Sequence, residues 1–154
     1  MKRVLIVLGV IGLIGFSACH TNKDGKVMLS RAFPTSSWER FDFVERIVEL
    51  EKPTTYNLSL TATFSPVYPY DYFSMAFSVL DEEAHPLRSK NYRFSLKDRD
   101  GLWKSELTDG VYRFTFPINS ELTLNEPGTY TFQIENLMSI TPLTGINEIV
   151  LTNQ

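Results

Sequence analysis

The chain of 154 residues carries 18 acidic and 15 basic residues, which gives a formal net charge of −3 at pH 7. This mild acidity, with charges of both signs interspersed, argues against a surface that binds nucleic acid or anionic lipid. The length suffices for one domain with a hydrophobic core. A single cysteine cannot form an internal disulfide, so stability must come from packing, to which an aromatic content of 13% is well suited.

The first 18 residues have the layout of an export signal. Lys2 and Arg3 provide a positive start, residues 4–14 are apolar, and small residues lead to Cys19. The apolar run is shorter than the roughly 20 residues of a transmembrane helix. Residues 16–19, Phe-Ser-Ala-Cys, resemble a bacterial lipobox, in which a peptidase cleaves before a cysteine that carries diacylglycerol. We therefore predict that residues 1–18 are a lipoprotein signal peptide, which is removed, and that Cys19 carries lipid. An ordinary cleaved signal, with Cys19 as an incidental thiol, is the alternative.

Residues 19–26 are polar after the cysteine and are predicted to form a flexible tether, followed by a domain over residues 27–154. The resemblance to Gram-negative lipoproteins implies a diacylglyceryl thioether and an amide-linked acyl group on Cys19. Two or more acyl chains make membrane attachment lasting. We expect this covalent lipid and no other cofactor. We also expect anchorage in the cell envelope, with the outer membrane favoured, on either its periplasmic or its surface face.

The pattern after the tether is that of β-strands. Residues 27–33 predict a first strand that ends at Pro34, and residues 34–37 are typical of a turn. Residues 41–48 alternate in part and predict a second strand, although their apolar residues also suit one short helix. Pro53 ends this segment in either case.

The next run, residues 56–64, places Tyr, Leu, Leu, Ala and Phe on one face over nine residues, which predicts a half-buried strand. A loop rich in Pro and Tyr, residues 65–71, interrupts the alternation, which resumes over residues 72–80. The acidic residues 81–83 predict a hairpin tip, and residues 87–96 predict the returning strand.

Two turns follow, at residues 97–101 and 108–110, where Asp and Gly suit positive φ angles. Residues 111–118 predict a strand in which Pro117 indicates an edge strand or a strand end, because proline lacks the amide hydrogen. Residues 129–135 predict another strand, and residues 148–152 a last one.

These segments amount to about eight strands with turn signals every 8–12 residues and no convincing long helix. The predicted fold class is all-β, an antiparallel β-sandwich with strands in jelly-roll order. The sequence shows no internal repeat, linker or second domain.

No residue set amounts to an active site. The two histidines are His20, in the tether, and His85, in a predicted hairpin, and neither has a catalytic or zinc-binding motif around it. Residues 98–101, Asp-Arg-Asp-Gly, lack the spacing of a calcium loop and are interpreted as an ordinary turn. We therefore predict no catalytic, cofactor-binding or metal-binding residues, and a protein that is not an enzyme.

Five aromatic residues are the best candidates for a recognition surface that contacts a sugar or a protein partner. Aromatic rings stack on sugars and anchor protein interfaces, but they also fill the cores of sandwich domains, and both interpretations remain open. The candidates are Tyr68, Tyr70, Tyr72, Trp38 and Trp103.

Several short motifs, in this order and together with the lipobox, resemble the gliding-motility lipoprotein H (GldH) family of Bacteroidetes over nearly all of the predicted mature chain. The motifs are Phe33-Pro34…Trp38, Tyr56-Asn57-Leu58, Tyr68-Pro69-Tyr70, Gly101-Leu102-Trp103, Pro127–Phe132 and Leu143–Ile146. The resemblance implies a non-enzymatic envelope lipoprotein, needed by the gliding machinery and associated with the secretion system that shares its parts. It implies envelope protein partners and transfers one residue role, the acylation of Cys19. A surface lipoprotein that binds glycans through the tyrosine loop is the alternative hypothesis.

Overall fold

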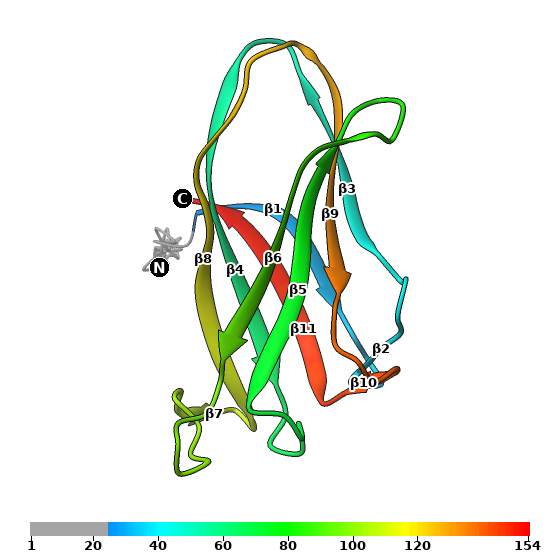
Figure 1. Ribbon diagram of the computed structural model, residues 1–154. Helices are drawn as coiled ribbons and strands as arrows, with labels where there is room; N and C mark the ends of the chain where they lie inside the picture. Colours follow the sequence, from blue (N-terminus) through cyan, green and yellow to red (C-terminus); the bar gives the residue numbers. More distant parts are fainter. Residues whose placement is uncertain (1–24) are drawn as a thin grey trace, which may run out of the picture.

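The structure, a computed structural model, describes residues 25–154 and is an antiparallel β-sandwich (Figure 1). The predicted signal peptide and Cys19 lie outside the described residues. One sheet has five strands in the order β1-β11-β4-β8-β7, the other has four in the order β3-β9-β5-β6, and β10 and β2 form a small two-stranded pair. The strands are β1 Lys26–Ala32, β2 Ser37–Trp38, β3 Val44–Leu50, β4 Thr54–Phe64, β5 Tyr72–Leu80, β6 Pro86–Ser95, β7 Leu107–Thr108, β8 Val111–Leu124, β9 Gly128–Asn136, β10 Leu143–Thr144 and β11 Ile146–Asn153.

The eight longer strands follow the jelly-roll order that the sequence predicted. Taken in chain order, the first of them pairs with the eighth, the second with the seventh, the third with the sixth and the fourth with the fifth. Such a folded-over hairpin, wrapped into two sheets, is the jelly roll. The described part of the chain contains no helix long and apolar enough to cross a membrane.

Two of the predicted elements need correction. The strand predicted over residues 41–48 begins only at Val44, because residues 41–43 form a loop, and its pairing with β9 excludes the helical alternative. Pro117 does not end its strand, since β8 continues to Leu124. The prediction that Pro117 lies at an edge is confirmed. On the side of β8 away from β4, β7 pairs only with Val111 and Tyr112, so Pro117 has no partner strand on that side. A bulge in the pairing of β8 with β4 lies beside Pro117.

The core lies between the two sheets and is built from the alternating faces that the sequence indicated. The apolar residues of β4, β5 and β9 are buried, and at the β2–β10 end the core becomes strongly aromatic. There the Trp38 ring stacks on Phe33 at 5.1 Å and lies 6.3 Å from Phe73. Phe64 lies 4.7 Å from Tyr68. Each such ring removes about 150–250 Å² from water, which explains how the domain is stable without disulfides.

Gly145 closes this end of the sandwich, between β10 and β11. Its φ angle is +84°, and a Cβ atom there would lie 2.7 Å from the Cα of Tyr68. We predict that Gly145→Ala lowers the free energy of unfolding by about 2–4 kcal/mol, because the backbone conformation is strained for Ala and the Tyr68 backbone cannot move aside. Urea denaturation measures this, with Gly101→Ala as the control, since Gly101 has a similar φ of +78° but open space around it. Equal losses in the two variants would contradict the close packing of Tyr68 on Gly145.

Candidate interaction surfaces

Of the five non-glycine residues with a positive φ angle in the described chain, one presents an aromatic side chain to solvent. Phe41, in the loop between β2 and β3, is 67% exposed and has a φ angle of +63°. A bulky residue in this left-handed region is a genuine outlier that costs roughly 1–2 kcal/mol. Such strain persists only where the surroundings over-determine the conformation, and it gathers at functional sites.

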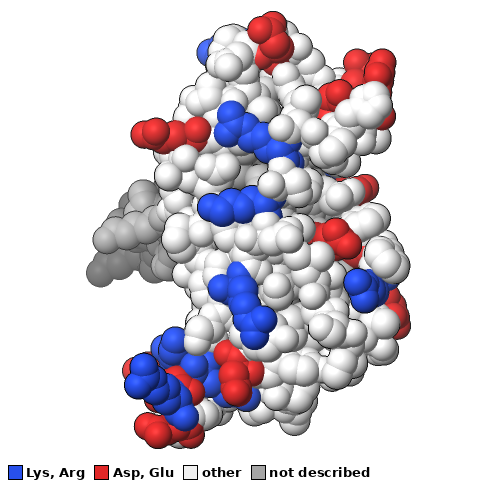
Figure 2. Space-filling model, viewed as in Figure 1, with Lys and Arg blue, Asp and Glu red and all other residues white. Residues whose placement is uncertain are grey.

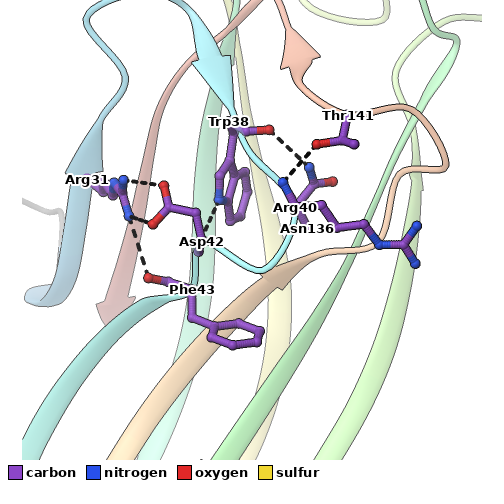
Figure 3. Close-up of polar contacts among 7 residues, drawn as sticks. All are labelled: Arg31, Trp38, Arg40, Asp42, Phe43, Asn136 and Thr141. Carbon is purple, nitrogen blue, oxygen red and sulfur yellow. Dashed lines mark hydrogen bonds and ion pairs between the residues drawn. The ribbon is translucent and has the colours of Figure 1, made fainter.

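The surroundings of Phe41 do fix its loop (Figure 3). The guanidinium of Arg31, on β1, donates a hydrogen bond of 2.9 Å to the carboxylate of Asp42 and a longer one to the carbonyl of Phe43. The Nε1–H of the buried Trp38 donates to the carbonyl of Asp42 at 2.7 Å. A core ring and an ion pair with β1 thus restrain the residues on the C-terminal side of Phe41.

A second loop joins this surface from the other side. The backbone N–H of Arg40 donates to the Oγ1 of Thr141 at 2.9 Å, which links the β2–β3 loop to the β9–β10 loop. Ile140, next to Thr141, is 57% exposed. The guanidinium of Arg40 lies 5.2 Å from the centre of the Phe41 ring. We call Phe41, Arg40 and Ile140 the Phe41 surface; it combines exposed apolar groups with a cation, as protein interfaces do.

Two of the five aromatic candidates from the sequence belong to the core. Trp38 is fully buried and Tyr68 is 1% exposed, so neither can stack on a sugar or a partner in this fold. The Tyr68 hydroxyl donates to the carbonyl of Tyr72 at 2.9 Å. Burial, followed by the nearby Tyr70 and Tyr72, raises the pKa of Tyr68 well above its ordinary value, so the phenol stays protonated at physiological pH.

The other three candidates, Tyr70, Tyr72 and Trp103, are half-buried, and they do not form one open platform. The guanidinium of Arg93 lies 3.5 Å from the centre of the Tyr72 ring, and the Nζ of Lys97 lies 4.8 Å from that of Trp103. These two rings therefore already have cation–π partners. A sugar that stacked on either ring would have to share or displace a cation.

A feature that the sequence analysis missed lies along the open side of the sandwich between β6 and β8. Partly buried rings from both strands stack there in a row: Phe94 lies on Phe116 with centroids 3.9 Å apart, and Phe114 and Tyr92 extend the row on either side. The Tyr92 hydroxyl donates to the backbone carbonyl of Ile118 on β8. Alternation in β6 and β8 could have indicated that these rings share inner faces, but only the strand order brings the two strands together.

The acidic residues at the hairpin tips have structural partners. The Oδ1 of Asp98 accepts the N–H groups of Asp100 and Leu102, and the Oδ1 of Asp81 accepts those of Glu83 and His85. Asp side chains commonly accept such hydrogen bonds from backbone amides in turns, in agreement with the turns predicted from the sequence. Among the described residues no group of three or more His, Cys, Asp and Glu side chains could hold a metal ion.

The strand order and the Phe41 surface together describe a small β-sandwich of the jelly-roll class with one exposed aromatic loop. The chain belongs to the GldH lipoprotein family, whose model matches residues 27–152. The family description names a lipoprotein and no reaction, and it confirms the resemblance found in the sequence.

The other comparisons add little. No curated protein sequence matches the chain. Among solved structures, one with similarity is a GH115 4-O-methyl-α-glucuronidase, BtGH115A, described as specific for decorated arabinogalactans. It shares 11% identity at a TM-score of 0.36, over 99% of this chain and 20% of that one, so the chain spans about a fifth of that enzyme.

Proposed function

We propose that this protein is a non-enzymatic adaptor of the cell envelope, anchored by lipid on Cys19, and that it binds a protein partner of the gliding-motility and associated secretion machinery. Membership of the GldH lipoprotein family supports the anchor and the cellular setting. The outer membrane is the proposed location. The observation that carries the binding role is Phe41, an exposed aromatic residue held in a strained conformation on a braced loop.

The position of Phe41 suits a lipid-anchored adaptor. The described chain begins beside β1, whose first residue, Lys26, pairs with Asn153 near the C-terminus (Figure 1). Arg31, which holds Asp42, lies near the other end of β1. A strand of this length spans roughly 20 Å at about 3.3 Å per residue. The Phe41 surface therefore lies at the far end of β1 from the predicted tether, where it can meet a partner away from the membrane.

The test is site-specific photo-cross-linking in intact cells, with a photoreactive residue at position 41 or, as the control, at position 102. Leu102 is matched in exposure, at 65%, but lies in the β6–β7 loop. We expect position 41 to yield one dominant cross-linked envelope protein that position 102 does not. The same pattern of products from both positions, or none from position 41, would contradict the proposed role of this surface.

A substitution at Phe41 separates binding from stability. Phe41→Gly should raise the free energy of unfolding by about 1 kcal/mol, because Gly adopts positive φ without strain. The envelope protein that cross-links at position 41 should no longer co-purify with this variant. Urea denaturation and affinity purification from native membranes measure the two effects, and Leu102→Gly serves as the control that keeps its partners. A destabilised Phe41→Gly protein would contradict the strain. Retention of the protein that cross-links at position 41 would contradict the interface.

A further inference from the structure

The two open sides of the sandwich differ in how their strand edges are covered. On one side, between β1 and β3, the guanidinium of Arg46 donates to the backbone carbonyl of Met28 at 3.0 Å and so covers part of the β1 edge. A hollow of about 410 Å³ lies beside this contact. On the other side, β6 ends its sheet and pairs only with β5.

The hydrogen-bond pattern identifies the free amides of β6. The N–H of Leu96 donates to the carbonyl of Asp71, and this pair continues the β5–β6 register. Hydrogen-bonded and non-bonded pairs alternate in antiparallel sheets, so the amides of Lys90 and Tyr92 point to β5. Within residues 89–93, the amides that point away from the sheet are those of Ser89, Asn91 and Arg93. No described residue accepts a hydrogen bond from these three amides.

The same edge is strongly basic. The ten residues of β6 include Arg88, Lys90 and Arg93 and no acidic residue, in a chain of net charge −3. Figure 2 shows basic side chains spaced down the middle of the face that β6 crosses, with acidic groups towards its ends and along its sides. A second copy of β6 would bring cations against cations, and such pairs are destabilising. The charge therefore disfavours self-association and favours an acidic occupant.

Arg88 and Lys90 also line a hollow of about 430 Å³, to which Phe77 and Leu87 contribute apolar side chains. Both cations pair in register with buried residues of β5, so they lie on the inner face of β6. Tyr92 and Phe94 continue this face towards the stacked row of rings. A strand added to β6 would thus meet two cations and then two aromatic rings along its inner face. The second cation, the Nζ of Lys90, lies 5.0 Å from the centre of the Tyr92 ring, so an acidic side chain would share Lys90 with this ring.

We propose that the free edge of β6 binds an extended, acidic peptide segment of a partner protein by strand addition, with acidic side chains towards Arg88 and Lys90 and apolar side chains towards Tyr92 and Phe94. Main-chain hydrogen bonds give affinity in this mode and alternate side chains give specificity. The three unpaired amides favour a polypeptide over an anionic polysaccharide, which would use the cations alone. This site is separate from the Phe41 surface. Only its biological use, the binding of a partner protein in the envelope, rests on the proposed adaptor role.

The test is amide-resolved hydrogen exchange of the purified mature protein in detergent, with and without an octapeptide. The peptide has Ser at alternate positions and, at the other four, Glu, Glu, Val and Val in that order. Its reversed sequence is tested as well, because strands add in either direction. We expect one of the two peptides to protect the amides of Ser89, Asn91 and Arg93 and to leave the exchange of Lys90 and Tyr92 unchanged. No protection of these three amides by either peptide would overturn the proposal.

Charge variants and a second ligand complete the test. Arg88→Glu together with Lys90→Glu should weaken peptide binding about tenfold or more, whereas Lys52→Glu with Arg99→Glu, an equal charge change at exposed positions outside β6, should not. Polygalacturonate that bound through Arg88 and Lys90 more tightly than the peptides, without amide protection, would overturn strand addition in favour of a glycan site. A Phe41→Gly protein should bind the peptide normally, so failure of the Phe41 surface and failure of this site are distinguishable.

Discussion

Replacement of Cys19 by Ser should release the protein from the membrane and leave the domain folded. The acyl chains predicted on Cys19 contribute about 0.8 kcal/mol for each methylene group buried in the bilayer, so their loss removes most of the membrane affinity. The described strands begin at Lys26, and Cys19 is part of none of them. Membrane fractionation with immunoblotting measures the release, and circular dichroism of the soluble form tests the fold.

The control for this experiment is His20→Ser, which changes the neighbouring residue and should keep the protein in the membrane fraction. A partner could hold an unacylated protein at the membrane, so the Cys19→Ser substitution is also combined with Phe41→Gly. Membranes are also washed with alkaline carbonate, which removes proteins held only by protein contacts, including any contact at β6. Retention of the double variant in the washed membranes would contradict a lipid anchor on Cys19.

The largest loss of stability is expected from Trp38→Ala. The side chain is fully buried, stacks on Phe33 and donates to the carbonyl of Asp42, so its removal leaves a large cavity and an unpaired carbonyl. We expect a decrease in the free energy of unfolding of about 3–5 kcal/mol, a large fraction of the 5–15 kcal/mol typical of a domain.

Urea denaturation measures this loss, with Trp103→Ala as the matched control. Trp103 is only half-buried and should cost about 1–2 kcal/mol. Trp38→Phe keeps most of the packing but removes the Nε1–H donor, so it should cost less while loosening the loop of Phe41. A Trp38→Ala protein as stable as the Trp103→Ala protein would contradict the assignment of Trp38 to the core.

The sequence was most informative where side chains alternate over a long strand. The face of β4 and the faces of β5 and β9 were predicted correctly, because period two is a property of the strand itself and needs no knowledge of its neighbours. The jelly-roll order was favoured from the number of strands and their turn signals, but periodicity alone does not determine which strands pair. Several residues that carried the family resemblance, among them Trp38, Tyr68 and Leu143, are buried core residues.

The Phe41 surface could not be predicted from the sequence. Phe has a strong β propensity, so residues 41–43 were assigned to the following strand, whereas the contacts of Asp42 with Arg31 and Trp38 hold them in a loop. The sequence also could not decide which aromatic residues are exposed and which belong to the core. Tyr68 and Tyr70 share a loop, and only tertiary contacts determine that Tyr68 is buried. The free edge of β6 likewise depends on the strand order rather than on any local signal.

Intact mass spectrometry of the protein purified from native membranes tests whether this β-sandwich is held to the envelope through one acylated cysteine. We expect a mature chain that begins at Cys19 and carries a diacylglyceryl group on its sulfur together with an amide-linked acyl group. A chain that begins after residue 19, or a Cys19 with a free thiol and no lipid, would contradict it.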